Sequence, residues 1–391
     1  MSLSTLPLCY CTNVHPGRTL AEVEQGLESY AASIARLFDG PLSIGLWFAD
    51  SVSHELVETP GAISRLRDRL AEHGLSCHTL NAFPFGDFHD DRVKELVYLP
   101  DWSTPERLDY SLRCAAILAE LIPEGREGSV STLPLGFTPA VETLAFVDDC
   151  ISNLLSAAKR LDELHSESGR VIRLAIEPEP FCRIETTPEA VAFFARLRQR
   201  ADADGCRELV DQHVGLCYDV CHQAVEFEDA AESIAAIRQA DIRINKVQIS
   251  CAIELARPAE NAEGRQALAE YVEPRYLHQT FVRRPDGELI RLPDLAREFC
   301  LEPPASFLDA ESWRVHFHVP VHETQIGPLA TTRPQLESAL AAIATLDYAP
   351  HLEVETYTWN VLPGGERLSI VEGIVAELAA TRKLLGDLRL K

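Results

Sequence analysis

Short apolar segments alternate with longer amphipathic segments along almost the whole chain. Apolar runs bounded by turn residues are typical of strands buried in a parallel sheet, and their alternation with helices favours βα units. The expected strands cover residues 6–12, 42–48, 76–81, 130–135, 171–176, 214–218, 244–249 and 352–356. The expected helices cover residues 19–37, 61–73, 105–121, 139–165, 188–200, 229–240, 334–346 and 369–385. Because no Gly-x-Gly-x-x-Gly follows the first strand, this pattern favours a closed (β/α)8 TIM barrel over an open doubly wound sheet.

A long irregular stretch, residues 250–332, follows the seventh expected strand. It is far longer than an ordinary βα loop, so we expect it to carry function or structure of its own. Arg-Pro-Asp-Gly at 284–287 predicts a hairpin turn between two strand-like runs, and residues 313–321 alternate like a further strand. We therefore expect one TIM-barrel domain over residues 1–391, with 250–332 as an inserted, lid-like segment at the mouth. Gly386 is the expected C-terminal stop of the last helix.

The composition is that of a globular protein with an acidic surface. The chain has 391 residues, of which 46% are hydrophobic, and its formal net charge of -24 disfavours a nucleic-acid partner. A phosphorylated small molecule remains possible as the ligand, because one arginine or one helix N-terminus can hold a phosphate. The 11 cysteines lack paired CxxC spacing, so we expect reduced core cysteines in a cytoplasmic protein. Neither a signal peptide nor a membrane-inserted segment is expected.

Acidic and amide residues stand where four of the expected strands end. They are Glu177, Asp219, Gln248 and Glu355, and His222 follows Asp219 by three residues. Any one of them alone is more often a helix N-cap or a surface residue than a ligand. In a parallel barrel, however, the C-terminal ends of the strands meet at one mouth. Four oxygen donors at that mouth predict a site for a divalent metal ion.

At these strand ends the chain resembles the xylose isomerase-like superfamily of TIM barrels, which includes sugar isomerases, ketose 3-epimerases and the endonuclease IV type. The resemblance covers nearly the whole chain. It is carried by Ile-Glu-Pro-Glu-Pro at 176–180, Asp-Val-Cys-His at 219–222, Val-Gln-Ile-Ser at 247–250 and Glu-Val-Glu-Thr at 353–356. Within the superfamily, Cys-Tyr-Cys-Thr-Asn-Val-His-Pro-Gly at 9–17 and Leu-Glu-Val-Glu-Thr-Tyr-Thr-Trp at 352–359 look most like the metabolite-traffic branch encoded in Ebo-type operons.

The resemblance implies roles for the strand-end residues. Glu177 and Glu355 match the two glutamates that the epimerases use as metal ligands and as an acid/base pair, Asp219 matches a third ligand, and His222 matches a histidine that touches substrate. Gln248 is a departure, because the epimerases usually carry a histidine ligand there. An amide oxygen suits Mg²⁺ or Mn²⁺ better than Zn²⁺, so the metal remains one of these three.

Two glutamates two residues apart compete for one of these roles. Side chains two positions apart on a strand share a face, so the period does not separate Glu353 from Glu355. Glu355 is favoured because it lies nearer the C-terminal end of the strand, and Glu353 is the alternative. Glu179 is the corresponding neighbour of Glu177.

Further candidates for substrate binding come from the insertion and from the ends of the first strands. His318 and His278 lie in the insertion, where Arg283 is a candidate for holding a carboxylate or phosphate. His316 shares a strand face with His318. We also expect four residues near the mouth, namely His15, its neighbour Asn13, Trp47 and Trp359. Core packing explains the two tryptophans nearly as well.

Together these patterns predict a metal-dependent isomerase- or epimerase-like enzyme acting on a small polyhydroxylated or cyclitol-like metabolite, a sugar or a sugar phosphate. Removing a proton next to a carbonyl calls for a carboxylate base and a metal that polarises the oxygen. Two alternatives stay open. One is a metabolite-binding or delivery protein on the same barrel, with other proteins of its pathway as partners. The other is an endonuclease IV-like metal phosphodiesterase.

Overall fold

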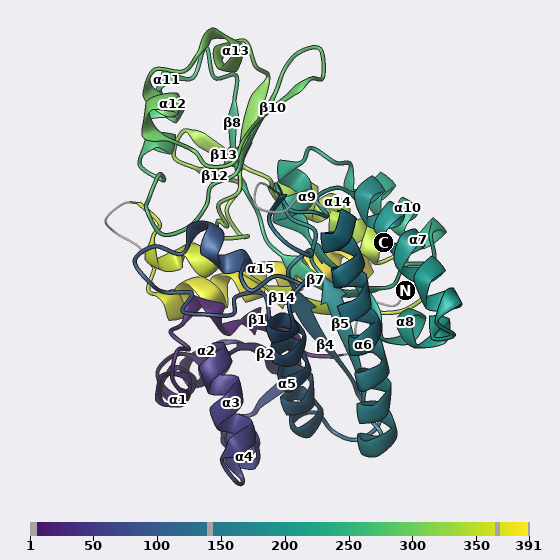
Figure 1. The fold of residues 1–391 in the computed structure, drawn as a ribbon. Helices are drawn as coiled ribbons and strands as arrows, with labels where there is room; N and C mark the ends of the chain where they lie inside the picture. The colour runs from purple at the N-terminus through teal and green to yellow at the C-terminus, as the bar shows by residue number, and fades with distance from the viewer. Residues whose placement is uncertain (1–5, 139–143, 364–367, 390–391) are drawn as a thin grey trace.

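The computed structural model describes residues 6–138, 144–363 and 368–389 (Figure 1). Eight parallel strands close into a barrel in the order β1-β14-β7-β6-β5-β4-β3-β2. They are β1 Leu8–Cys11, β2 Leu42–Trp47, β3 Leu75–Asn81, β4 Glu127–Thr132, β5 Val171–Ile176, β6 Val214–Asp219, β7 Ile244–Ile249 and β14 His351–Val354. The predicted (β/α)8 barrel is thus confirmed.

Helices cover the outside of the barrel (Figure 1). They include α1 Leu20–Gly26, the π-helical turn η2 Leu27–Ala31, α2 Ala32–Leu37, α3 Asp50–Glu58, α4 Ala62–Glu72, α5 Pro105–Leu121, α6 Leu144–Ser168, α7 Thr187–Ala203, α8 Arg207–His213, α9 Val220–Val225, α10 Ala230–Gln239, α14 Arg333–Ile343 and α15 Ile370–Arg389. Local capping explains where two of them begin, because Thr19 and Thr186 each form a capping box with a glutamate three residues later. None of these helices is long and apolar enough to cross a membrane, as far as the described residues extend.

Three differences or gaps between the predicted and observed helices need comment. The expected start of the fourth helix at residue 139 lies outside the described residues. The short helices α3 and α8 were not predicted. The predicted stop at Gly386 was wrong, because α15 continues through it to Arg389. Gly386 lacks the positive φ of a C-terminal cap, and one glycine inside a helix costs only about 1 kcal/mol.

The insertion between β7 and α14 folds into its own antiparallel sheet at one end of the barrel (Figure 1). Its strands are ordered β10-β9-β11-β8-β13-β12 and comprise β8 Ile253–Ala256, β9 Thr280–Arg283, β10 Leu289–Leu292, β11 Ser312–Val315, β12 Gln325–Ile326 and β13 Leu329–Thr331. Helices α11 Ala262–Ala269, α12 Arg297–Leu301 and α13 Ala305–Leu308 accompany it. The predicted hairpin is confirmed as β9 and β10, with Gly287 in the turn at φ 85°. The further strand predicted over 313–321 ends already at Val315.

A buried carboxylate on α15 connects this helix to the two segments that reach the mouth. Glu377 accepts hydrogen bonds from the Val321 amide (3.0 Å), the Thr356 hydroxyl (2.6 Å) and the Trp359 indole (2.9 Å). Burial raises its pKa to about 7, although the three donors act in the opposite direction. Glu377 therefore positions the chain next to Glu355 and downstream of His318.

Replacing Glu377 by Ala is expected to destabilise the fold by about 1–3 kcal/mol, because three donors lose their acceptor in a buried place. The free energy of unfolding in urea measures the effect. Lys383→Ala, an exposed change on the same helix, is the matched control and should shift stability by less than about 0.5 kcal/mol. Equal stability of the two variants would contradict this role for Glu377.

Candidate metal centre and substrate cavity

A cavity of about 530 Å³, measured with its opening to solvent, lies between the barrel mouth and the insertion. Barrel residues such as Glu177, His222 and Glu355 line it together with insertion residues such as Gln279 and His318. The rest of the lining consists of Asn13, Asn81, Phe83, Pro84, Phe88, Val93, Lys94, Val97, Tyr98, Glu179, Tyr276, Leu277, His316 and Tyr357. Its mixture of aromatic and polar groups is typical of a small-molecule site.

Three carboxylates from three strand ends converge at this cavity, and two of them line it. Glu177 directly follows β5, Asp219 ends β6, and Glu355 directly follows β14. One oxygen of each lies within 4.8 Å of the others, and all three side chains are buried. We call these residues the carboxylate cluster. The parallel register produces it, because each strand delivers its last side chain to the same end of the barrel.

The electrostatics of the carboxylate cluster suit a cation. Burial, followed by the charges of Glu355 and Asp219, raises the pKa of Glu177 well above its ordinary value. Burial and the charge of Asp219 likewise raise the pKa of Glu355 to about 8. Glu177 Oε2 and Asp219 Oδ2 have no hydrogen-bond partner within the described part of the chain. A divalent cation would remove the repulsion and satisfy these oxygens, so the residues fit a metal site.

Gln248 lies beside the carboxylate cluster on β7. It is level with Asp219 in the β6–β7 register and is fully buried. Neither its amide oxygen nor its amide nitrogen has a hydrogen-bond partner among the described residues. A buried amide without hydrogen-bond partners is costly. Binding a cation would give the amide oxygen of Gln248 a partner, so this residue is compatible with a role as a metal ligand.

The structure separates Glu353 from Glu355. Glu353 is paired with Lys246, whose Nζ lies 2.6 Å from Glu353 Oε1, and both side chains are fully buried. Burial lowers the pKa of Lys246, but the surrounding acidic groups, of which Glu353 contributes most, together outweigh burial and keep that pKa above its ordinary value. The carboxylate of Glu353 packs directly against Gly45, and a Cβ atom at position 45 would overlap it. Glu355 instead accepts hydrogen bonds at Oε1 from the side-chain amides of Asn13 (2.7 Å) and Asn81 (3.0 Å).

Three imidazoles form a second group at the mouth. His222 comes from the first turn of α9, and His316 and His318 come from the segment that follows β11. Their ring centroids lie 4.6 Å (His222–His316), 5.7 Å (His222–His318) and 5.2 Å (His316–His318) apart, and all three are buried. We call them the imidazole cluster. Glu179 lies next to it, with Oε1 at 3.5 Å from His316 Nδ1.

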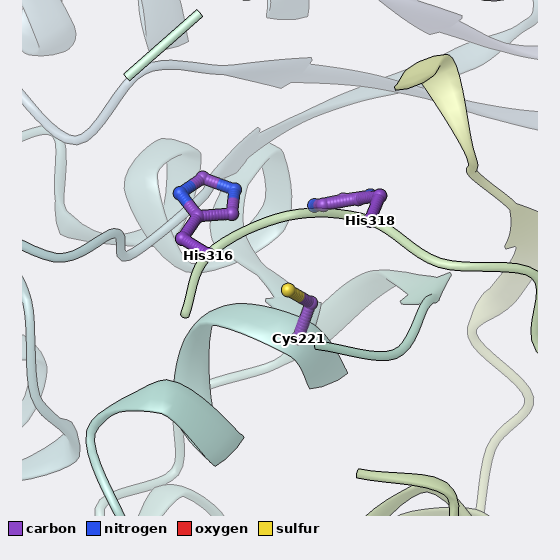
Figure 2. A group of neighbouring side chains, drawn as sticks. All are labelled: Cys221, His316 and His318. Carbon is purple, nitrogen blue, oxygen red and sulfur yellow. The ribbon is translucent and has the colours of Figure 1, made fainter. Parts of the chain in front are cut away.

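Cys221 also lies within 4.8 Å of nitrogens of His316 and His318. Figure 2 shows its thiol pointing toward the segment that carries both rings. The sulfur packs in an apolar cluster with Val225, Ala252 and Phe281, and burial raises the thiol pKa well above its ordinary value. Cys221 therefore contributes to apolar packing beneath the two rings.

Five residues predicted near the mouth are not part of this cavity lining, and one of them is Trp359, which donates its indole N–H to Glu377. His278 contacts Glu273 (3.0 Å) inside the insertion, and Arg283 pairs with Glu311 (3.1 Å). His15 stacks on Tyr30 of η2, and burial lowers its pKa to about 3. With Trp47 it lines a separate small cavity of about 270 Å³ between β1, β2 and α1.

Sequence reasoning assigned no role to several residues that the cavity brings together. Asn81 ends β3 and holds Glu355, so the strand-end argument applied to Glu177 could have found it. Tyr98 and Gln279 both donate to Glu179 Oε1, at 2.8 Å and 3.2 Å. Nothing in their local sequence signals this, because both reach the cavity from long connections.

The chain is similar over its length to solved xylose isomerase-like barrels. An L-ribulose 3-epimerase is 14% identical, with 100% of this chain and 96% of that chain covered and a TM-score of 0.51. A xylose isomerase-like TIM barrel protein from Mycobacterium smegmatis, in complex with magnesium, is 14% identical, with 99% of both chains covered and a TM-score of 0.54. No protein-family model and no curated protein matches the chain. At these identities the likeness shows the fold.

Proposed function

We propose that the protein is a metal-dependent, isomerase- or epimerase-like enzyme that moves a proton next to a carbonyl of a small polyhydroxylated or cyclitol-like metabolite. The observation that carries the proposal is the carboxylate cluster at the mouth of the barrel. Two similar barrels support it, since one is an L-ribulose 3-epimerase and the other was solved with magnesium. The metal, which Glu177, Asp219, Gln248 and Glu355 would hold, supplies polarisation of the substrate carbonyl.

The two glutamates would carry the proton. One of Glu177 and Glu355 takes it from the carbon beside the carbonyl, and the C–H electrons pass to the carbonyl oxygen as an enediol-type species forms. The other returns a proton to carbon, so the net reaction needs no oxidant and no further reactant. In the absence of a cation, burial raises the pKa of Glu355 to about 8, and a bound cation would lower it. Asn13 and Asn81 hold its carboxylate in place.

The cavity favours an uncharged polyol over a phosphorylated substrate. Of the described residues that line it, Lys94 is the one lysine or arginine, and it is engaged by Asp294 (2.7 Å) and the Glu273 carbonyl (3.3 Å). Hydroxyl groups would instead find the amides of Asn81 and Gln279 and the hydroxyl of Tyr98. The same lining disfavours a phosphodiesterase. We further propose that the insertion acts as a lid, because its residues complete the cavity.

A binding or delivery protein on the same barrel is the second candidate. Gln248 supports it, because an amide in place of a histidine weakens a zinc site. We also propose that the protein belongs to the metabolite-traffic branch encoded in Ebo-type operons. This proposal rests on the sequence motifs at residues 9–17 and 352–359.

Solvent exchange separates the enzyme from the binder. In D₂O, a panel of ketoses, inososes and their phosphates is incubated with protein loaded with Mg²⁺, Mn²⁺ or Zn²⁺, and NMR follows deuterium at the carbon beside the carbonyl. An enzyme incorporates deuterium into its substrate, because the abstracted proton exchanges with water. A ligand that raises the melting temperature in a concentration-dependent way, yet incorporates none, would establish the binder instead.

Gln248→His is expected to strengthen zinc binding at the carboxylate cluster by about tenfold or more, because an imidazole is a better zinc ligand than an amide oxygen. Competition with a chromophoric zinc chelator measures the affinity. Gln248→Leu, which removes the oxygen, is the matched control and should weaken Mg²⁺ and Mn²⁺ binding. If neither change alters the affinity for any of the three metals, Gln248 is not a ligand.

A further inference from the structure

A group of three ligand-type side chains lies at the other end of the barrel from the cavity. Asp162 and His165 stand three residues apart on α6, and His213 is the last residue of α8, directly before β6. The two helices pack against each other. One ligand atom of each side chain lies within 4.8 Å of those of the other two. We call these residues the helix-pair cluster.

The helix-pair cluster is separate from the carboxylate cluster. His213 stands directly before the first residue of β6, whereas Asp219 is the last residue of that strand, and six strand residues span about 20 Å. The two places therefore cannot share an ion, and the chemistry proposed at the mouth uses none of these three side chains. In a (β/α)8 barrel the N-terminal end contributes to stability, while the C-terminal end carries the active site.

His213 has one ring nitrogen that the fold leaves open. Its Nδ1 lies 2.8 Å from the Ile172 carbonyl, and a carbonyl oxygen only accepts, so Nδ1 carries a proton. Burial lowers the pKa of His213, so the ring is neutral and Nε2 offers a lone pair. Nε2 has no hydrogen-bond partner in the described chain, although the side chain is fully buried. An imidazole held by a carbonyl at Nδ1 with Nε2 open is the usual arrangement of a metal ligand.

Asp162 places a carboxylate oxygen near that lone pair. Its Oδ1 lies 3.7 Å from His213 Nε2, which is too long for a hydrogen bond. Two ligand atoms of a tetrahedral zinc ion lie roughly 3.3 Å apart, given bonds of about 2.0–2.1 Å. The observed separation is thus close to that of two atoms sharing an ion. No lysine or arginine of the described chain forms an ion pair with Asp162, so no cationic side chain neutralises its charge.

His165 completes the group from the next turn of α6. Residues three apart share a helix face, so Asp162 and His165 both face α8. The ring centroids of His165 and His213 lie 6.3 Å apart, and His165 Nδ1 lies 3.1 Å from the side-chain amide of Gln212. This amide can donate to Nδ1 or, after a half-turn, accept from it. Gln212 therefore does not fix the tautomer of His165, and a lone pair remains available to an ion.

We infer that Asp162, His165 and His213 form a structural site for a zinc-like divalent ion that cross-links α6 to α8. Two imidazole nitrogens and one carboxylate oxygen suit Zn²⁺, and water can fill the fourth position because Asp162 and His165 are partly exposed. The ion would join the end of α6, which leads into β5, to the end of α8, which leads into β6. The inference is independent of the proposed function, since none of the three residues lines the cavity.

The test measures zinc binding by the full-length protein. Chelator-treated protein is titrated with Zn²⁺ in competition with a chromophoric chelator. Asp162→Asn and His165→Gln, both at partly exposed positions, should each weaken one zinc-binding step by about tenfold or more, because each replaces a zinc ligand by a poorer one. Glu163→Gln, an exposed change on α6, is the matched control and should leave this step unchanged, as should Glu177→Gln, which changes only the carboxylate cluster.

A measurement on wild type does not depend on a variant that folds. In crystals prepared with a slight excess of zinc, anomalous scattering at the zinc edge is expected to place an ion between α6 and α8. Equal zinc affinity in wild type, Asp162→Asn and His165→Gln, or an anomalous peak at the carboxylate cluster alone, would overturn the inference. Zinc between the helices without deuterium exchange would retain it and refute the proposed function, whereas exchange without zinc between the helices would do the reverse.

Discussion

Glu355→Gln is expected to lower the rate of deuterium exchange into substrate by roughly 10²–10⁴-fold, the usual contribution of general acid–base catalysis. The amide keeps the shape of the side chain, and its oxygen can still accept the hydrogen bonds of Asn13 and Asn81 at the position of Oε1. It loses the basic oxygen and one negative charge of the carboxylate cluster. We therefore also expect weaker binding of Mg²⁺ or Mn²⁺, measured by competition between metals.

Stability distinguishes this catalytic role from a structural one. In metal-free protein the carboxylates repel one another, and burial with the charge of Asp219 raises the pKa of Glu355. Removing one carboxylate relieves this repulsion, so metal-free Glu355→Gln should unfold at the same urea concentration as wild type or a higher one. A variant that lost exchange only because it was much less stable would not support a role in proton transfer. Exchange at the wild-type rate would eliminate Glu355 as the base.

The barrel and the carboxylate cluster were predictable because both follow from local patterns. Buried strands of a parallel sheet read as apolar runs, and each run ends at the same face of the barrel. Glu177, Asp219 and Glu355 thus converge through a rule that needs no knowledge of distant contacts. Applied to β3, the same rule would have included Asn81, just as it included the amide of Gln248 near the end of β7.

The imidazole cluster was harder to predict, because contacts between the insertion and distant barrel loops determine it. The hydrogen bonds Gln279–Glu179 and Tyr98–Glu179 join residues 100 and 81 positions apart. Periodicity showed that His316 and His318 share a face, but it did not show that this face meets His222. The strand also ends at Val315, so both histidines lie on an irregular segment.

His15 and Trp47 line a different cavity from the one that holds the carboxylate cluster. Both stand close to strand ends, which placed them near the mouth in the sequence interpretation. The chain turns through the 3-10 helix Thr12–Val14 immediately after β1, and His15 then packs against Tyr30 on the helical layer. Trp47 donates its indole N–H to the Pro84 carbonyl (3.0 Å). Position along a strand does not fix the direction of side chains in the turn that follows.

The buried pair of Lys246 and Glu353 leads to the second large expected effect. Lys246→Met is expected to destabilise the protein by about 3–5 kcal/mol, because it leaves the carboxylate of Glu353 buried without its cation. The Nζ–Oε1 distance is 2.6 Å, and the further partner that Nζ has among the described side chains is the Ser131 hydroxyl at 3.2 Å. Urea denaturation at several pH values measures the loss.

The double variant Lys246→Met/Glu353→Met tests the reason for this loss. It replaces both charges by unbranched apolar side chains, and such replacements of buried pairs are often neutral or stabilising by about 1–4 kcal/mol. Stability should therefore return to near the wild-type value, giving a large coupling energy in the double-mutant cycle. Because Glu353 faces Lys246 and Glu355 faces the cavity, the double variant should retain metal binding and exchange. If it instead loses its metal while remaining folded, Glu353 is a ligand and the assignment of Glu355 has to be exchanged for it.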